Sequence, residues 1–449
     1  MSEKSVIILD GCASADKDLL PILDVLSQAF YADGAKVVTF PLHEMKLAYC
    51  LGCFGCWVKM PGMCVEADAG REIAQAIIRS DVTVLFTPVT FGGYSPELKK
   101  MVDRFIQLTS PFFQMYHGEV HHPPRYAHRP RLMMVGVQRH AKPSEAHIFR
   151  TLAGRNAINF HPPGYAVEVV LSTEDLDALR RRFAALLARS DSLPFGEAAS
   201  SLMPSPVAAP IAAEPAGARR ALLVVGSPKI NQPSTSSAMG NFLVNCLVQR
   251  GWETESLTLK ASLNRPEGVD ELLSAVDRAS LLLLAFPLYV DALPYLVTKA
   301  LAIIADHRQA QQQQSAQRLA AVVNCGFPET HQNSLALAIC REFAAQSGIA
   351  WAGGLAFGAG GMIGGQPLAD AQRSGPPLRN VITALELTAA SLAEGLPVPA
   401  EAVRMITKNR IPFALWSRLY TWMGSRSFEK MAARNGISKD KLMARPYAT

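Results

Sequence analysis

The residues of this chain that most clearly suggest chemistry are four cysteines in the stretch YCLGCFGCWVKMPGMC, residues 49–64. Their spacing is C-x2-C-x2-C-x7-C, and they are Cys50, Cys53, Cys56 and Cys64. A C-x2-C-x2-C run wraps three thiolates around one side of an iron-sulfur cubane, and a fourth comes from elsewhere in the chain. Cys64 can supply the fourth, because Pro61 and Gly62 allow the chain to turn back. We expect these four side chains to bind metal.

Two other roles remain open for these cysteines. Structural zinc also takes four thiolates, although usually as two separated pairs, and a C-x-x-C pair can act as redox thiols. Tyr49, Phe54 and Trp57 would shield a cluster from water and influence its potential. The remaining cysteines fall on predicted strand ends and helices, where buried packing is expected. They are Cys12, Cys246, Cys325 and Cys340.

A second candidate site is the loop GSPKINQPSTSSAMGN, residues 226–241. Gly226 permits a sharp turn after a strand, Lys229 supplies a cation, and the serines and threonine of 234–237 supply hydroxyls before a helix. Free N–H groups at a helix start bind phosphate, although the same hydroxyls suit an ordinary N-cap. The position directly after the first strand of this half of the chain favours phosphate.

The matching loop near the N-terminus reads DGCASADKD, residues 10–18. It contains Asp10, Asp16 and Asp18 but a single lysine, so a dianionic phosphate would be repelled. We therefore expect phosphate to bind in the second half of the chain rather than here.

Two further loops share a pattern, TPVTFGGYSPELKKMVDRF at 87–105 and FPLYVDALPYLVTKALAII at 286–304. Each places a proline, then an aromatic within three residues, then a second proline near a helix start. Such an extended loop can offer backbone groups and an aromatic ring to a flat heterocycle. It can equally serve to pack a strand end into the core.

These loops join short apolar strands that alternate with amphipathic helices in both halves of the chain. The first half is predicted to have strands at 5–11, 35–42, 81–88, 131–137 and 165–172, and helices at 18–32, 69–79, 95–108 and 174–189. The second half is predicted to have strands at 219–229, 253–259, 279–287, 319–326 and 349–358, and helices at 237–250, 267–277, 294–305 and 333–346. This alternation predicts a doubly wound, five-stranded parallel α/β sheet in each half. Ligands of such sheets lie beyond the carboxyl ends of the strands.

The two halves align by hand, and the first carries an insertion. Phe40 matches Leu257 and Pro88 matches Pro287, so the first half is about 18 residues longer between these points. That surplus is the cysteine segment. The chain between the halves, rich in Pro, Ala and Ser, is predicted to be a linker. The predicted division is a domain at 1–190, the linker at 191–218, a domain at 219–377 and a helical, basic extension at 378–449.

The composition of the 449 residues, 49% hydrophobic and 18% charged, is typical of a soluble globular protein with two domains. The net charge of +6 is no footprint of nucleic-acid binding, and it comes from the tail, where 401–449 holds ten Lys or Arg against three acidic residues. We find no apolar run long enough for a membrane span and no secretory signal. The expected location is cytoplasmic, with free thiols rather than disulfides.

Both halves resemble the flavodoxin-like NAD(P)H-dependent FMN reductase family, over most of residues 1–370. GSPK with the following STSS resembles the FMN phosphate loop of that family, and TPVTFGGYSPELKKMVDRF resembles its loop beneath the isoalloxazine ring. The cysteine spacing is similar to that of the branch called iron-sulfur flavoproteins, in which four such cysteines hold a [4Fe-4S] cluster. The residues that the resemblance assigns to cofactor binding are Ser227, Lys229, Ser234, Thr235, Ser236, Pro287, Leu288, Tyr289, Val290, Asn324 and Gly326, with Pro88, Val89, Thr90, Phe91 and Gly92 in the first half.

The resemblance implies a tandem duplication in which each half supplies what the other lacks. The protein is then expected to pass electrons between FMN in the second domain and a [4Fe-4S] cluster in the first. Electrons would come from NAD(P)H or from a ferredoxin-like redox partner protein, and the dimers common in the family make a homodimer a further expectation. Two alternatives remain, a cluster-free NAD(P)H-dependent FMN or quinone-type reductase and a cofactor-free binding or regulatory module.

The tail stretch NRIPFALWSRLYTWMGSRSFEKMAARNG predicts a basic amphipathic helix. One face carries Ile411, Leu415, Leu419 and Trp422 or Met423 among basic residues such as Arg410. We expect this face to pack against the chain itself or a second subunit, as surface helices usually do. Peripheral contact with an anionic membrane is the alternative.

Overall fold

The computed structural model describes residues 3–189, 219–229, 233–311, 316–368, 375–407 and 413–448. The predicted linker, 191–218, lies outside these described residues. The chain divides into two compact units: unit 1 is Met1–Leu202 with Arg418–Thr449, and unit 2 is Met203–Ser417.

Unit 1 is built on a five-stranded parallel sheet with the order β2-β1-β3-β6-β7. Its strands are β1 (Ser5–Asp10), β2 (Lys36–Pro41), β3 (Val82–Pro88), β6 (Arg131–Gln138) and β7 (Tyr165–Leu171). The central strand β3 is buried at every residue, as parallel strands covered on both faces are. This is the doubly wound sheet that the sequence predicts.

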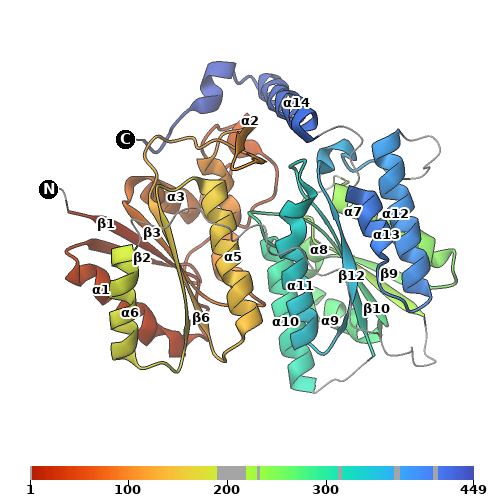
Figure 1. Ribbon diagram of the computed structural model, residues 1–449, viewed down its shortest axis with the longest axis horizontal. Coiled ribbons are helices and arrows are strands. Elements are labelled where there is room, and N and C mark those ends of the chain that lie inside the picture. The colour runs from red at the N-terminus through yellow and green to blue at the C-terminus, as the bar shows by residue number, and fades with distance from the viewer. Residues whose placement is uncertain are drawn as a thin grey trace. The chain divides into compact units, whose positions relative to one another are not determined.

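Helices cover the sheet of unit 1, and they are α1 (Leu20–Ala32), α3 (Ala69–Arg79), α4 (Pro96–Val102), α5 (Pro143–Phe160) and α6 (Leu176–Arg189). Helices α1 and α6 lie side by side along the sheet (Figure 1). Their side chains form one apolar core with the strands. Local chemistry sets where the helices begin. The Asp68 carboxylate caps α3 by accepting the Gly70 N–H, and the Ser95 hydroxyl caps α4 by accepting the Leu98 N–H.

Unit 2 repeats the plan, with the parallel order β12-β11-β10-β8-β9. Its strands are β8 (Arg220–Val225), β9 (Glu253–Thr258), β10 (Leu281–Pro287), β11 (Arg318–Asn324) and β12 (Ala350–Phe357). The helices along it are α7 (Thr235–Val248), α8 (Leu259–Leu263), α9 (Gly268–Arg278), α10 (Tyr295–Gln311) and α11 (Ser334–Gln346). Both sheets are thus flavodoxin-like in strand order, and the predicted fold class is confirmed.

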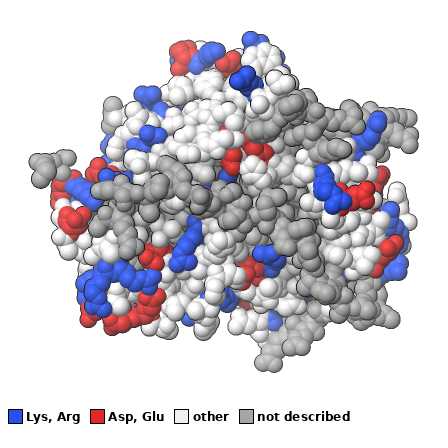
Figure 2. All heavy atoms as spheres, in the orientation of Figure 1, with Lys and Arg blue, Asp and Glu red and all other residues white. Residues whose placement is uncertain are grey.

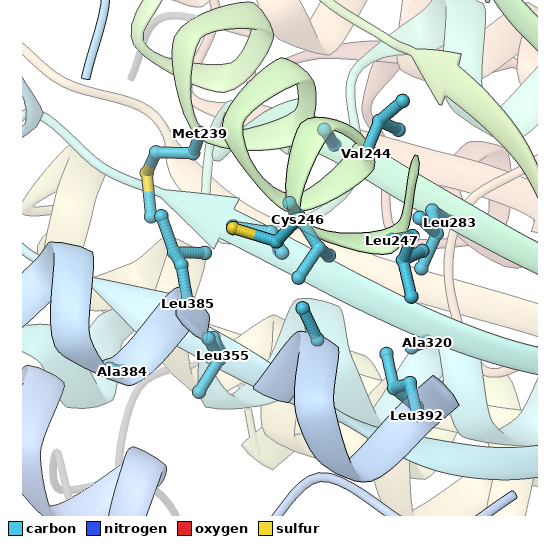
Figure 3. Close-up of a cluster of buried hydrophobic side chains, with 14 of the residues drawn as sticks. Met239, Val244, Cys246, Leu247, Leu283, Ala320, Leu355, Ala384, Leu385 and Leu392 are labelled. Carbon is cyan, nitrogen blue, oxygen red and sulfur yellow. The ribbon is translucent and has the colours of Figure 1, made fainter. Parts of the chain in front are cut away.

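The C-terminal helices are shared between the units. Helices α12 (Pro376–Ala393) and α13 (Ala400–Thr407) bury apolar side chains in the core of unit 2. Figure 3 shows Leu385 and Leu392 of α12 facing Cys246 and Leu355 from α7 and β12. Helix α14 (Phe413–Arg434) continues from Arg418 into unit 1, as does the short helix η5 (Lys439–Met443). The predicted extension, 378–449, is therefore divided between the two units.

Besides the short helix α2 (Gly55–Val58), two features of unit 1 have no counterpart in the sequence prediction. Between β6 and β7 the prediction shows no helix, yet α5 runs there for 18 residues, as a parallel crossover requires. Its buried side includes Glu145, Arg155 and Asn156, which obscure an apolar period. The second missed element is an antiparallel hairpin of β4 (Gln114–Tyr116) and β5 (Glu119–His121).

The charge distribution on the surface and the hydropathy of the helices indicate which kinds of partner the chain could bind. On the face shown in Figure 2, Lys and Arg side chains are interspersed with Asp and Glu rather than gathered in one basic field. Among the helices of the described residues, none is long and apolar enough to cross a membrane.

Candidate functional site

The cysteine segment of unit 1 follows β2 and precedes α3, and it contains one short helix, α2 (Gly55–Val58). Gly52 and Phe54 both have left-handed backbones, with φ of 63° and 53°. Phenylalanine rarely adopts this conformation, and residues that do so concentrate at functional sites. The two left-handed residues alternate with Cys53 and turn the chain sharply through the C-x2-C-x2-C run.

These turns bring the four thiols into one neighbourhood. Cys56 lies within electrostatic reach of the other three, and Cys50 within reach of Cys53 and Cys64. A backbone amide points at one of the sulfurs, since the Gly55 N–H donates to Cys53 Sγ at 3.4 Å, and the backbone of Gly52 acts to lower the pKa of Cys50. All four are free cysteines. Amides directed at sulfur are among the features that tune iron-sulfur clusters.

The acidity of the thiols bears on the two alternative roles of the cysteines. Burial raises the pKa of Cys50 to about 12 and raises that of Cys56 well above its ordinary value. A redox pair needs a lowered thiol pKa, so these values argue against reactive thiols. Among the described residues, no group of three or more His, Cys, Asp or Glu side chains stands close enough to hold a metal ion as the side chains are placed.

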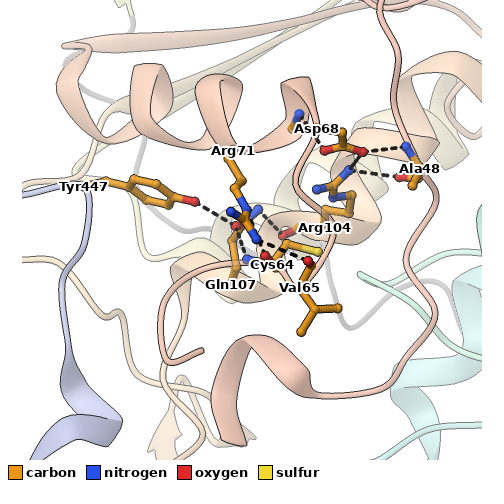
Figure 4. A network of polar contacts seen from close by, with 9 residues as sticks. Ala48, Cys64, Val65, Asp68, Arg71, Arg104, Gln107 and Tyr447 are labelled. Atoms are coloured by element: carbon orange, nitrogen blue, oxygen red, sulfur yellow. Dashed lines mark hydrogen bonds and ion pairs between the residues drawn. The ribbon is translucent and has the colours of Figure 1, made fainter. Parts of the chain in front are cut away.

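Arg104 is a buried cation beside this segment (Figure 4). Its Nη1 donates to Asp68 Oδ2 at 2.6 Å and to the Ala48 carbonyl at 3.1 Å. Burial opposes the charge, yet Asp68 and the nearby thiols Cys64 and Cys50 raise the pKa of Arg104 overall. The Nε and Nη2 atoms are buried and have no hydrogen-bond partner in the described part of the chain.

Arg125 is a second buried cation, with no exposed surface. Its Nε donates to the Thr109 carbonyl at 3.2 Å, and its Nη1 donates to the carbonyls of Leu442 and Ala444 at 2.7 and 2.9 Å. Burial lowers the pKa of Arg125 to about 10, while Tyr126 and then Cys56 act in the opposite direction and Arg445 adds to the lowering. The guanidinium is therefore charged at neutral pH, and Nη2 has no partner among the described residues.

The backbone of Cys64 is held by a polar network that reaches the C-terminus (Figure 4). The Cys64 N–H donates to Gln107 Oε1 at 3.0 Å, and the Tyr447 hydroxyl donates to the same oxygen at 3.2 Å. Arg71 Nε donates to the Cys64 carbonyl at 3.0 Å. The last residues of the chain thus help to position a cysteine that lies nearly 400 residues earlier.

Aromatic side chains cover the segment, as the sequence predicts for Phe54 and Trp57. These two rings stack with centroids 5.3 Å apart, and Phe428 of α14 meets Trp57 edge-on at 4.9 Å. The Trp57 indole N–H is satisfied by the carbonyls of Ile106 and Thr109. Cys56, Trp57, Val58, Ala432 and Leu442 form one buried apolar cluster. The apolar side chains of this cluster therefore shield Cys56 from solvent.

Helix α14 packs through a different face from the predicted one. The packed residues include Phe428, Met431 and Ala432. Of the face predicted to pack, the described residues are exposed: Leu415, Leu419, Trp422 and Met423. Ile411 and Arg410 lie outside the described residues. The prediction that this face packs against the chain itself is wrong, because the surface around Trp57 contacts the side of the helix that carries Phe428. Packing of the exposed face against a second subunit stays a prediction.

In unit 2 the predicted phosphate loop ends at the start of α7. Ser234 and Ser237 form a reciprocal capping box, and the Ser237 N–H donates to Ser234 Oγ at 3.0 Å. As the first two residues of the helix, Thr235 and Ser236 have N–H groups with no acceptor within the helix, and no acceptor is found for them elsewhere in the described residues. Both the anion-binding and the N-cap interpretations of this loop are therefore compatible with the geometry.

Hydroxyls of this helix start tie the loop to neighbouring strands. Ser236 Oγ donates to Asn324 Oδ1 at 2.7 Å, at the end of β11, and Thr235 Oγ1 donates to the Gly360 carbonyl at 2.7 Å. The Leu288 N–H donates to the Asn324 carbonyl at 2.8 Å. Three of the predicted loops of unit 2 thus meet at one edge of the sheet. The predicted residues Ser227 and Lys229 precede the helix, with Ser227 buried and Lys229 exposed, whereas Gly326 is exposed beyond β11.

The predicted heterocycle loop of unit 2 is a tight turn. Tyr289 and Ala292 exchange backbone hydrogen bonds of 3.0 and 3.1 Å, while Val290 and Asp291 have φ of 47° and 58°. A left-handed valine is a genuine outlier, because its branched side chain crowds the backbone. Pro287, Leu288, Tyr289 and Val290 are all partly exposed, which leaves the loop accessible.

Unit 1 has the same kind of turn at residues 90–93, but this turn is more buried than the one in unit 2. Thr90 and Gly93 exchange backbone hydrogen bonds, with Phe91 and Gly92 in left-handed conformations. Gly92 packs so closely on Ile148 that an added Cβ would lie 2.5 Å from it. Of the predicted residues here, Pro88, Phe91 and Gly92 are buried, and Val89 and Thr90 are partly exposed.

The first loop of unit 1 is already filled by its own carboxylates. Asp10 Oδ1 accepts the Cys12 N–H at 2.9 Å, and Asp16 Oδ2 accepts the Ala13 N–H at 2.7 Å. Arg139 forms ion pairs with Asp16 and Asp18. Burial raises the pKa of Asp10. These carboxylates occupy amides that a phosphate would need.

Four side chains of the cysteine site are absent from the sequence prediction: Arg71, Arg104, Gln107 and Arg125. Arg104 and Gln107 lie within the stretch predicted as the heterocycle loop and its helix, and no motif marks Arg125. Nothing in their spacing relative to the cysteines could have revealed them, because only the fold brings these segments together.

Comparison with known proteins relates the N-terminal unit to flavin enzymes. Residues 5–169 match the family model described as NADPH-dependent FMN reductase. An iron-sulfur flavoprotein of Archaeoglobus fulgidus is 28% identical over 85 residues, which cover 19% of this chain and 38% of that protein. An iron-sulfur flavoprotein of Methanocaldococcus jannaschii is 34% identical over 71 residues, covering 16% of this chain and 35% of that protein. The chain thus spans little more than a third of the length of these two relatives.

Among solved structures, the FMN-dependent NADH-azoreductase of Bacillus anthracis is similar over 39% of this chain and 99% of that one. The sequence identity is 12% and the TM-score is 0.30. The fold assignment therefore depends on the strand order of the two sheets rather than on this similarity.

The left-handed conformation of Val290 generates a prediction about stability. We expect Val290→Gly to raise the free energy of unfolding of unit 2 by about 1 kcal/mol, because glycine adopts positive φ without steric cost. Urea denaturation of both proteins measures the change.

The control is Val248→Gly near the end of α7, where valine is half exposed and helical. That variant should lose about 0.5 kcal/mol through the flexibility of glycine. Equal destabilisation by the two substitutions would show that the Val290 turn is unstrained.

Proposed function

We propose that this protein is an oxidoreductase of the iron-sulfur flavoprotein type, with one FMN in unit 2 and a [4Fe-4S] cluster at the four cysteines of unit 1. The observation that carries the proposal is the gathering of four thiols beside two buried guanidinium groups. Of the two, Arg104 pairs with Asp68, whereas Arg125 has no carboxylate partner among the described residues, and a buried cation of that kind suits an anionic metal centre. The FMN reductase match of residues 5–169 supports a flavin-dependent activity.

In unit 1, Cys50, Cys53, Cys56 and Cys64 would be the ligands of the cluster. The Gly55 N–H donates to Cys53 Sγ and would lower the electron density on this sulfur. Trp57 and Phe428 exclude water from one side. Cys53, the most exposed of the four, would mark the side from which an electron carrier approaches.

In unit 2, the N–H groups of Thr235 and Ser236 would bind the FMN phosphate, with Lys229 as a counter-charge. The turn at Tyr289 and Val290 would offer backbone groups to the ring system. Asn324 holds this turn and the helix start at one edge of the sheet, which orients the two parts of the site. The carboxylates of Asp10 and Asp16 oppose a second FMN in unit 1.

When bound, FMN supplies two-electron hydride chemistry together with release of single electrons, which a cluster carries one at a time. The chain's own contribution is to hold the binding groups, to exclude water and to neutralise charge. NAD(P)H fits as the electron donor, since it is the reductant named for the matched family. A ferredoxin-like partner, a homodimer and a reducing cytoplasmic location are also compatible with these sites.

Two alternatives would show themselves in the composition of the purified protein. A cluster-free NAD(P)H-dependent FMN or quinone-type reductase would contain flavin without iron. A cofactor-free binding or regulatory module would contain neither. Buried Arg125 favours the cluster over both, because neither alternative gives its guanidinium a counter-charge.

Cofactor content after anaerobic purification tests the proposal directly. We expect about four iron, four sulfide and one FMN per chain, by ultraviolet–visible spectroscopy and chemical assay. The variant carrying Cys53→Ala and Cys56→Ala should lose the iron and its absorbance but keep FMN, because the sites belong to different units.

Cys12→Ala is the matched control, because Cys12 is buried in the same unit but lies outside the cluster segment. It should retain iron at the wild-type level. Loss of FMN together with iron in the double variant would contradict separate sites.

The assignment of FMN to unit 2 predicts unequal effects of two lysines. We expect Lys229→Ala to weaken FMN binding about tenfold, which corresponds to about 1.4 kcal/mol, because it removes a cation from the phosphate loop. Lys17→Ala makes the same change in the matching loop of unit 1 and should leave affinity unchanged. Fluorescence titration of FMN measures both, and the reverse order would assign the flavin to unit 1.

The exposed face of α14 supports a further proposal, peripheral contact with an anionic membrane. Trp422 and Met423 are each more than half exposed, and Arg426 lies 4.5 Å from the Trp422 ring. A groove of about 580 Å³ beside them is lined by Met115, Arg418, Thr421, Trp422, Ser425, Arg426, Glu429 and Lys439. Exposed aromatic and basic groups together suit an anionic lipid surface.

Flotation with phosphatidylcholine vesicles, with and without phosphatidylglycerol, tests this contact. The wild type should float only with the anionic vesicles, and Trp422→Ala should reduce the floated fraction several-fold. Tyr31→Ala is the control, since Tyr31 is equally exposed on α1. Absence of flotation with anionic vesicles would exclude the membrane contact.

A further inference from the structure

Arg125 poses an electrostatic problem that the polypeptide alone does not resolve. The side chain has no exposed surface, and every contact of its guanidinium is with a backbone carbonyl. No carboxylate among the described residues pairs with it. A buried cation without a counter-ion costs several kcal/mol. The buried guanidinium of Arg125 therefore needs a negatively charged partner, and the described residues place no carboxylate against it.

The groups next to Arg125 and Arg104 are the cysteine thiols. Arg125 lies within electrostatic reach of Cys56, and Arg104 within reach of Cys50 and Cys64. Arg104 has one carboxylate partner, Asp68, yet it keeps two buried nitrogens without acceptors. Arg125 keeps one such nitrogen. The guanidinium nitrogens that have no acceptor, Nε and Nη2 of Arg104 and Nη2 of Arg125, therefore lie near the cysteine segment.

The C-terminal segment determines where Arg125 lies. The carbonyls of Leu442 and Ala444 accept from its Nη1, and Arg445 Nε donates to the Arg125 carbonyl at 2.8 Å. The same segment packs on the cysteine loop, since a Cβ on Gly62 would lie 2.6 Å from Pro446. The cation is thus fixed by chain segments on either side of it and has little freedom to turn towards solvent.

We propose that Arg104 and Arg125 are the counter-charges of the metal-bound thiolates and raise the reduction potential of the cluster. This inference rests on the proposed function. A cluster with four thiolates is anionic when oxidised and gains one more negative charge when reduced. Fixed positive charge in a low-dielectric surrounding favours the more negative state. The arginines act on the cluster through charge and do not bind iron.

The test compares charge removal with charge retention at Arg125. Arg125→Met keeps much of the packing and removes the charge, whereas Arg125→Lys keeps the charge. The reduction potential of the reconstituted, full-length protein is measured by titration followed by electron paramagnetic resonance. We expect Arg125→Met to lower the equilibrium constant for reduction at least tenfold, about 59 mV. Arg125→Lys should stay within threefold of the wild type.

Arg155→Met is the matched control. Arg155 is a buried arginine of the same unit, but it pairs with Glu119 and not with the cysteine segment. Its replacement should leave the potential unchanged even if the protein becomes less stable. A purely structural role of Arg125 would instead show as equal stability losses in the Met and Lys variants, without a potential shift.

A second variant covers the case in which Arg125→Met does not fold. Arg104→Gln removes a charge while keeping amide donors for the Ala48 carbonyl, and its potential should also fall at least tenfold in equilibrium constant. Wild-type protein that takes up no iron would refute the proposed function itself. Iron-loaded variants with unchanged potentials would overturn the role of the arginines alone.

Discussion

The organisation of unit 1 depends on one constraint, that buried positive charge must be balanced. Arg125 lies without exposed surface beside Gly62 of the cysteine segment, and its guanidinium donates to the carbonyls of Thr109, Leu442 and Ala444. Arg104 connects α3 and the loop before the cysteines, through Asp68 and Ala48. Asp68 balances the charge of Arg104, whereas Arg125 has no carboxylate partner among the described residues, and the proposed cluster would supply the missing negative charge.

The two units show how one fold is specialised by its loops. Their sheets have the same strand order, and both place a tight left-handed turn after the central strand. At the end of the first strand they differ, since unit 1 fills its loop amides with Asp10 and Asp16, whereas unit 2 presents hydroxyls and Lys229. The cysteine insertion adds a second kind of site to unit 1 without disturbing its sheet. The same sheet plan thus carries different loops in the two units, and the proposed difference between their sites depends on these loops.

Much of the architecture could be predicted because strands and helices leave periodic patterns. All ten strands of the two sheets lie where apolar runs predict them, and the alignment of Phe40 with Leu257 agrees with their pairing to Leu9 and Val224. Helix α5 was missed because polar residues such as Arg155 are buried on its inner side. The packed face of α14 was predicted wrongly because periodicity identifies an apolar face, while the partner surface decides which face is used.

By itself, the sequence determined the doubly wound fold, the duplication, the cysteine spacing and the loops at the carboxyl ends of the strands. These features are local, since they follow from side-chain period, turn residues and short motifs. Only the tertiary structure decided that Arg104, Arg125, Gln107 and Tyr447 surround the cysteines, and that the tail divides between the two units. Contacts between residues that lie hundreds of positions apart depend on the shapes of the surfaces that pack together. The spacing of residues in the sequence does not reveal those shapes.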